Sequence, residues 1–320
     1  MTAGRTTDIH PAIDTALVRR LVDTQFPRWA GLPLRPLDRA GSEHVIHRLG
    51  ERLSVRLPRH AGAVGQALKE SVWLPRLAPR LPLAVPVPMA VGEPDFGYPW
   101  PWSVSRWLDG EVATVEGLAD SAEAAVGPAG FLAALQRTEP GEDREGLAVQ
   151  SPADRDGATR AAIAEASGTF DAAAMTELWD AALGAPGWDR PPVWFHGDLH
   201  TGNLLTTAGR LSAVIGVGGL GVGDPSCDLT IAFTLMSAGA RTVFREALGV
   251  DEATWTRGRG WALTTGLNAY TAYAAGDPRI AAQTTRQITE ALGAPRTAPL
   301  PGAVPTPGSG AVRMRTGFRR

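Results

Sequence analysis

Apolar residues recur along the chain at two spacings, one typical of helices and one typical of strands. Ile13, Leu17, Leu21 and Val22 share one face of a predicted helix within residues 11–29. Three shorter runs, residues 43–50, 52–58 and 101–108, predict strands because Gly, Pro and charged turns separate them. Residues 62–78 predict a helix that ends near Pro75. The first third of the chain therefore predicts a small sheet accompanied by helices.

The rest of the chain predicts mostly helix, with one short strand pair in the middle. Residues 111–184 are Ala-rich and mostly helical in pattern, and two strands are expected within 193–205 and 211–215. Two or three helices are expected from there to about residue 293. The tail, residues 294–320, is rich in Pro and Gly with five arginines and no acid, which predicts disorder.

Composition and charge exclude several classes of protein. With 320 residues and 44% hydrophobic residues, the chain can form one large bilobal domain or two ordinary ones. A net charge of -2 gives no global field that would attract nucleic acid or an anionic membrane, so neither partner is expected. No run approaches the length of a membrane span, about 18 residues, and the first residues lack a signal-peptide core. Cys227 is the single cysteine, which excludes an internal disulfide and favours a cytoplasmic location.

The stretch AVIGVGGLGVGDPSCDL, which starts at Ala213, contains a glycine motif. Gly216, Gly218 and Gly221 form G-x-G-x-x-G directly after an apolar run, which is the fingerprint of dinucleotide-binding proteins. In those proteins a helix opens at the last glycine, but here the letters GVGDP follow and would break one. No acid stands at the usual distance for ribose binding either. The pattern therefore favours a different kind of site.

The segment HGDLHTGNLL, residues 196–205, carries the clearest chemical signal. Asp198 follows a predicted strand in a tight loop, and Asn203 follows five residues later, before another strand. A carboxylate can accept or orient the proton of an attacking hydroxyl, and an amide oxygen can bind Mg²⁺, as phosphoryl transfer requires. Gly197 and Gly202 allow the backbone to bend around the ion.

This segment, together with GDPSCDL, resembles the aminoglycoside phosphotransferase family, which has a protein-kinase-like fold. His196, Gly197, Asp198 and Asn203 match its H-G-D-x-x-x-x-N pattern, and the resemblance covers roughly residues 25–290. It implies the α+β class: a small N-terminal lobe with an antiparallel sheet and a mostly helical C-terminal lobe.

The resemblance also implies boundaries and an activity. Residues 1–106 would form the nucleotide-binding lobe, and residues 107–293 would form the helical lobe with the catalytic loop and the substrate site. The implied reaction transfers a phosphoryl group from ATP or GTP, with Mg²⁺, to a hydroxyl of a small molecule, including antibiotics. Asp198 would be the catalytic residue and Asn203 a metal ligand.

In this family a basic residue on an N-lobe strand holds the nucleotide phosphates, and here it would be Arg56. Leu53, Val55 and Leu57 alternate on one face of that strand, so Arg56 points to the other face. Glu70, on the following helix, would pair with Arg56; the alternative is an ordinary exposed helical acid.

Other N-lobe positions follow from the same resemblance. Gly41 falls where the family has a short turn that covers the nucleotide. Backbone groups near Arg106, Trp107 and Leu108 would meet the edge of the base. A role for Trp107 in packing between the lobes stays open.

One position departs from the family pattern. The family has an aspartate that binds Mg²⁺ directly after the strand LSAVI, and this chain has Gly216. The resemblance expects His196, Asp224 and Asp228 to brace the catalytic loop, with the two aspartates also capping the next helix. Asp224 as a substitute metal ligand is the alternative.

Gly216 therefore leaves three interpretations: an active kinase, a non-catalytic relative that binds a nucleotide or metabolite, or a damaged copy of an enzyme. Residues 111–171, with twelve acidic and four basic side chains, are either a solvated helical face or a surface that attracts cationic substrates. Lys69 is the only lysine of the chain.

Overall fold

The structure, a computed structural model, describes residues 13–37, 43–141, 147 and 151–293. Gly41 and the tail at 294–320 lie outside the described residues, so the predictions made for them stay predictions.

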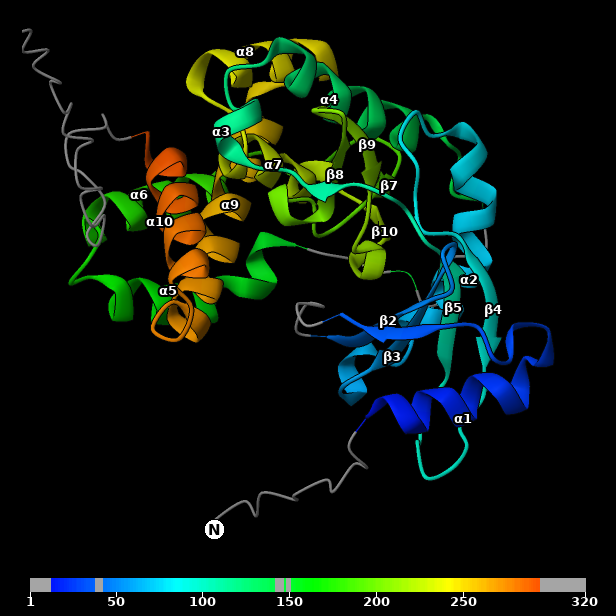
Figure 1. Ribbon diagram of the computed structural model, residues 1–320. Helices are drawn as coiled ribbons and strands as arrows, with labels where there is room; N and C mark the ends of the chain where they lie inside the picture. Colours follow the sequence, from blue (N-terminus) through cyan, green and yellow to red (C-terminus); the bar gives the residue numbers. More distant parts are fainter. Residues whose placement is uncertain (1–12, 38–42, 142–146, 148–150, 294–320) are drawn as a thin grey trace, which may run out of the picture.

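A five-stranded antiparallel sheet forms the smaller part of the molecule (Figure 1). Its strands are β1 (Leu34–Pro36), β2 (His44–Leu49), β3 (Leu53–Pro58), β4 (Pro88–Gly92) and β5 (Trp102–Arg106), in the order β1-β2-β3-β5-β4. The three predicted strands are β2, β3 and β5. The two edge strands escaped prediction because each is short and contains a proline, a residue that sheets tolerate at their edges.

Helices cover the two faces of this sheet. Helix α1 (Thr15–Gln25), capped by Asp14, packs its apolar stripe against Val55 and Leu57 in a small core. It is shorter than the predicted helix because Pro27 starts a separate 3-10 turn. Helix α2 (Gln66–Leu77) lies on the Arg56 side. It ends at Leu77, two residues after Pro75 and so near the predicted end, because a proline in the last turn removes only one helical hydrogen bond.

The larger part is mostly helical. Its helices are α3 (Val115–Leu118), α4 (Ala122–Arg137), α5 (Asp156–Ala166), α6 (Ala172–Gly184), α7 (Thr230–Thr234), α8 (Ala238–Leu248), α9 (Glu252–Tyr273) and α10 (Pro278–Leu292). Four helices follow the strands where two or three were expected. Ser237 accounts for the difference, because it caps α8 and so separates it from the single-turn α7.

Short strands connect the sheet part to the helices. Strands β6 (Glu111–Val112), β8 (Leu204–Thr207) and β9 (Arg210–Val214) form one sheet, and β7 (Val193–Phe195) pairs with β10 (Gly221–Gly223). Figure 1 shows these strands between the helices and the five-stranded sheet. None of the helices among the described residues is long and apolar enough to cross a membrane.

The described residues form two large apolar cores and a cluster of three residues, Phe195, Cys227 and Trp261. The two large cores do not divide at one residue. The small core unites α1 with the sheet, whereas Trp73, Leu74 and Leu77 of α2 belong to the large helical core. Helix α2 therefore contributes to both parts. The predicted division after Arg106, where β5 ends, stays a prediction.

Candidate active site

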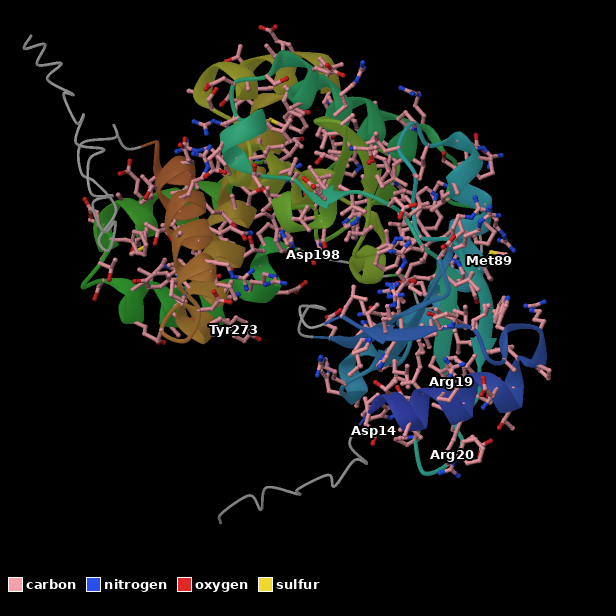
Figure 2. All side chains as sticks on the ribbon, in the orientation of Figure 1. Asp14, Arg19, Arg20, Met89, Asp198 and Tyr273 are labelled. Atoms are coloured by element: carbon pink, nitrogen blue, oxygen red, sulfur yellow. The ribbon has the colours of Figure 1, made fainter. Side chains whose placement is uncertain are left out.

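The loop between β7 and β8 carries the predicted catalytic segment. Strand β7 ends at Phe195, and the loop runs from His196 to the 3-10 turn Thr201–Asn203. Asp198 lies on the side of the helical part that faces the five-stranded sheet (Figure 2). Its side chain is 61% exposed, so a substrate can reach it.

Asp228 anchors the start of this loop through hydrogen bonds to the loop backbone. Its carboxylate accepts hydrogen bonds from the backbone N–H groups of His196 (2.7 Å) and Gly197 (2.8 Å). Asp228 is fully buried, and burial raises the pKa of its carboxyl to about 7 although both N–H groups stabilise the anion. The bracing predicted for Asp228 is thus present in the structure.

His196 ties the loop to the strand opposite. Its Nε2 lies 3.0 Å from the carbonyl oxygen of Ile215, and its Nδ1 accepts the backbone N–H of Asp198 at 3.2 Å. The ring is therefore neutral, with its proton on Nε2. Burial lowers the pKa of His196 to about 4, consistent with this state.

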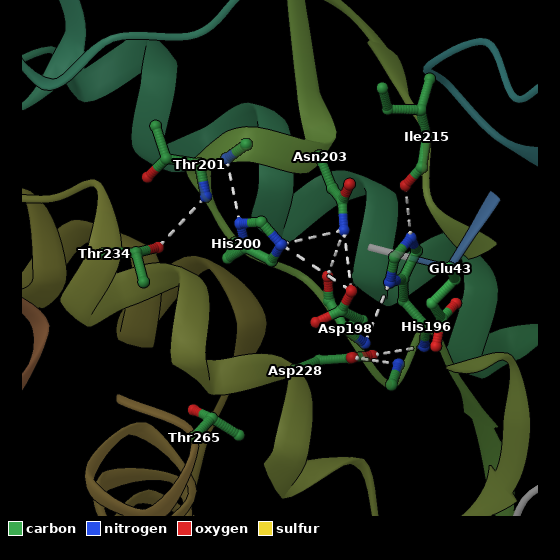
Figure 3. Close-up of polar contacts among 12 residues, drawn as sticks. Glu43, His196, Asp198, His200, Thr201, Asn203, Ile215, Asp228, Thr234 and Thr265 are labelled. Carbon is green, nitrogen blue, oxygen red and sulfur yellow. Dashed lines mark hydrogen bonds and ion pairs between the residues drawn. The ribbon is translucent and has the colours of Figure 1, made fainter. Parts of the chain in front are cut away.

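Asn203 and His200 lie beside the carboxylate of Asp198 (Figure 3). Nδ2 of Asn203 donates to the backbone oxygen of Asp198 at 2.8 Å and to Oδ2 at 3.1 Å. His200 Nε2 lies 3.7 Å from the same Oδ2. His200 Nδ1 accepts the backbone N–H of Gly202, and His200 Nε2 also lies 3.2 Å from Nδ2 of Asn203. The sequence analysis missed His200, whose only signal was a second histidine two residues after the aspartate.

The surroundings of Asp198 favour its protonated form more than water does. Partial burial raises the pKa of the Asp198 carboxyl, and the negative charge of Glu43 adds to the rise. His200 and Asn203 act in the opposite direction. Figure 3 shows Glu43, from the start of the sheet part, beside the loop. Glu43 was also missed, and its carboxylate accepts Nε2 of Gln66 at 2.8 Å.

Gly216 lies directly against Asn203. It has φ +69°, in the left-handed region, and a Cβ added there would stand 2.3 Å from Oδ1 of Asn203. The chain then forms a 3-10 turn, Val217–Gly219, and enters β10 at Gly221. No helix opens at Gly221, so the glycine motif is not a dinucleotide-binding turn.

Arg56 and Glu70 form the pair that the sequence predicts. Their Nη1 and Oε2 atoms are 2.6 Å apart, and the side chains are 11% and 1% exposed. Glu70 is therefore not an ordinary exposed helical acid. Burial raises the pKa of Glu70, and the guanidinium of Arg56 opposes that rise.

Lys69, the residue before Glu70, connects α2 to the glycine segment. Its ammonium donates to the backbone oxygens of Gly218 (2.5 Å) and Leu220 (3.1 Å). Desolvation lowers the pKa of Lys69, while Glu70 and Glu43 oppose the change. The sequence analysis assigned this lysine no role.

The predicted base-binding segment follows β5. The N–H of Arg106 already donates to Val87, and that of Trp107 donates to Arg52. Within the described part of the chain, no protein acceptor takes the N–H of Leu108. The Trp107 ring is half-buried with the guanidinium of Arg48 over it, 4.8 Å from the centroid.

Asp224 lies apart from the loop that it was expected to brace. Its carboxylate caps the 3-10 turn Pro225–Leu229 through the N–H of Ser226 and pairs with the buried Arg257 at 2.7 Å. Bracing therefore comes from Asp228, and Asp224 is engaged elsewhere.

Comparison with known proteins places these features in a family. A family model described as the phosphotransferase enzyme family matches residues 34–310. The chain belongs to this family. A comparison with curated proteins found no match.

Solved structures of phosphotransferases share the protein-kinase-like fold predicted for the chain. The GDP complex of wild-type aminoglycoside 2′-phosphotransferase-IIIa aligns with a TM-score of 0.67 at 17% identity, covering 88% of this chain and 99% of that one. The apoenzyme of the macrolide 2′-phosphotransferase MphH from Brachybacterium faecium aligns with a TM-score of 0.56 at 24% identity, with the same coverage. These likenesses confirm the fold.

Phosphotransferases commonly use Mg²⁺, and the donor set of this chain suits an ion that arrives with a nucleotide. Oδ1 of Asn203 and the carboxylate of Asp198 are oxygen donors, and Mg²⁺ often keeps waters and phosphate oxygens as its other ligands. Among the described residues, no cluster of three His, Cys, Asp or Glu could hold a metal. The residues present therefore fit a Mg²⁺ ion that arrives with a nucleotide.

Proposed function

We propose that the protein transfers the γ-phosphoryl group of ATP or GTP to a hydroxyl of a small molecule. The observation that carries this proposal is the solvent-accessible carboxylate of Asp198, held in one orientation by Asn203 and His200. Phosphoryl transfer depends mostly on positioning and on charge stabilisation, which such a rigid loop supplies.

Asp198 would act as the base. Oδ2 is already engaged by Asn203, so Oδ1 is the oxygen that can accept the proton of the attacking hydroxyl. Its raised pKa makes the carboxylate a better proton acceptor at neutral pH than an unperturbed aspartate. Asp228 and His196 would keep the loop from shifting as the proton moves.

Arg56 would neutralise the phosphates of the nucleotide, with Glu70 fixing the direction of its guanidinium. The base would meet the backbone after β5, and the free N–H of Leu108 supports a contact there. Magnesium, when bound, supplies charge neutralisation between phosphate oxygens, and Asn203 would be its protein ligand.

The acceptor would be a hydroxylated small molecule of the kinds that the similar structures are described with. One is a complex with GDP and kanamycin, and others are macrolide phosphotransferases. The excess of acids over bases at 111–171 supports a cationic acceptor.

A second function is favoured by Gly216. A chain that lacks the second carboxylate can bind a nucleotide or metabolite without turning it over. Binding and turnover must therefore be measured separately.

The test measures phosphorylated product from ATP and from GTP, with and without Mg²⁺, over a panel of aminoglycosides and macrolides. Asp198→Asn is expected to lower turnover by about 10²–10⁴-fold, the usual contribution of a general base, with unchanged nucleotide affinity. Asp120→Asn, an exposed aspartate of the helical part, is the matched control. Turnover that survives in Asp198→Asn overturns the assignment of Asp198. Tight nucleotide binding without turnover on any acceptor supports the binding function.

A further inference from the structure

A pocket lies on α2, α4 and β7, away from the candidate active site, and none of the predicted site residues lines it. Its volume is about 890 Å³. The side chains that give it chemical character are Trp73, Arg76, Arg80, Arg137, Glu139 and Trp194.

Positive charge dominates this pocket. Arg76, Arg80 and Arg137 are exposed, and within the described residues none of the three forms an ion pair. The guanidinium of Arg76 stands over the ring of Trp73, 5.0 Å from the ring centroid. The backbone oxygen of Arg76 accepts a hydrogen bond from the Arg80 side chain. Among the described residues that line the pocket, Glu139 is the single acid, so these residues carry a net positive charge.

Two tryptophans supply an aromatic wall. Trp73 and Trp194 pack edge to face, with ring centroids 4.8 Å apart. Trp194 is 1% exposed, and its indole nitrogen has no hydrogen-bond acceptor in the part of the chain that the structure describes. A buried donor without an acceptor is uncommon in proteins.

We propose that this pocket binds a small aromatic oxyanion, a planar ring that carries a phosphate or a carboxylate. Guanidinium groups bind both kinds of oxyanion through paired N–H donors. A planar ring would stack with the exposed guanidinium groups and contact the small accessible part of Trp73, with Trp194 buried directly beneath.

The pocket touches both elements that carry the candidate active site. Trp194 lies two residues before His196 on the strand that leads into the catalytic loop, and Trp73 lies one turn after Glu70 on α2. A ligand bound in the pocket would therefore contact both α2 and β7 and stabilise their packing without touching the predicted site residues.

The binding test follows the indole N–H signals of the ten tryptophans in a ¹H–¹⁵N spectrum. Trp194→Phe identifies the signal of Trp194, and it needs no nucleotide or activity. Phenyl phosphate and benzoate are the probes, and inorganic phosphate tests the anion without the ring. We expect a saturable shift of the Trp194 signal with at least one aromatic probe, and at least tenfold weaker binding of inorganic phosphate.

The double variant Arg76→Gln, Arg137→Gln is expected to lower the affinity of the aromatic probe at least tenfold. Arg28→Gln is the matched control, because Arg28 also stands over a tryptophan, Trp29, on the far side of the sheet part. Retained binding in the double variant overturns the proposal. A Trp194 signal that does not shift over the whole titration also overturns it. So does a shift that is lost in Arg56→Gln instead, which would place the probe at the nucleotide site.

Discussion

Gly216 and Asn203 share too little space for a side chain at position 216. An added Cβ meets the amide of Asn203 at 2.3 Å, and the positive φ adds about 1 kcal/mol of strain for most residues. Gly216→Asp must therefore rotate Asn203 away from Asp198 before its carboxylate can bind Mg²⁺. We expect Gly216→Ala and Gly216→Asp to lose similar stability, roughly 1–3 kcal/mol, without Mg²⁺.

Only Gly216→Asp should regain stability when Mg²⁺ and ATP are added, because only aspartate supplies an anionic ligand. Thermal unfolding of both variants, with and without Mg²⁺ and ATP, checks this. An equal response of the two variants would mean that residue 216 does not face the metal.

His196 makes stability depend on pH. Its folded pKa, about 4, is below the usual 6.5, so between these values the unfolded chain binds a proton that the folded chain does not. The contribution of His196 to the free energy of unfolding therefore falls as the pH is lowered through this window, by up to about 1.4 kcal/mol per pH unit.

His196→Gln removes that dependence. In urea unfolding, the difference between the free energies of unfolding of wild type and variant should be roughly 1–2 kcal/mol smaller at pH 5 than at pH 7. His60→Gln, at an exposed histidine, should keep the wild-type slope. A gap of constant size at both pH values would contradict the assignment of a neutral, buried His196.

Residues that the chain order brings together could be predicted, and residues that only the fold brings together could not. Asp198 and Asn203 lie in one loop, and the alternation of β3 places Arg56 toward α2. Lys69 reaches Gly218 across about 150 positions of sequence, and Glu43 approaches Asp198 from the start of β2. No local pattern carries such information.

Among the elements, α9 packs closely enough to need glycine. A Cβ at Gly260 would stand 2.3 Å from Cβ of Ala182 on α6. Gly260→Ala is expected to lower the free energy of unfolding by about 1–3 kcal/mol, since the two helices must separate. Gly130→Ala on α4 is the matched control, because its Cβ meets nothing within 4 Å.

The control should gain about 0.5–1 kcal/mol from the better helix propensity of alanine. Urea unfolding of both variants measures the difference. A stabilised Gly260→Ala would show that α6 and α9 can move apart freely.

Elements with a strong period were predictable, and elements defined by partners were not. The apolar stripe of α1 and the alternation of β3 indicate their type directly. Strand β10, three residues long, exists because it pairs with β7, and α2 runs past Pro75 because its last turn packs in the large core. Tertiary contacts decide such cases over local propensity.

For the whole molecule, the two apolar cores suggest two regions of separate stability. Leu57 is fully buried in the small core and Leu263 in the large one. Each Leu→Ala change should cost about 2–5 kcal/mol. Hydrogen exchange should accelerate mainly in α1, β2, β3 and β5 for Leu57→Ala, and mainly in α9 and α10 for Leu263→Ala.

Equal acceleration throughout the molecule in both variants would show one cooperative unit instead. The result bears on the predicted boundary after Arg106, because α2 lies beside the sheet but packs in the large core. Exchange in α2 should respond mainly to Leu263→Ala.

The placement of Lys69 has a consequence for chemical labelling. It is the only lysine of the chain, and both carbonyl partners and burial restrict its ammonium. Amine-directed reagents that modify side chains therefore find their single target in a protected position. A label on Lys69 therefore shows that α2 has separated from the glycine segment. The rate of labelling at this single side chain measures how often the contact opens.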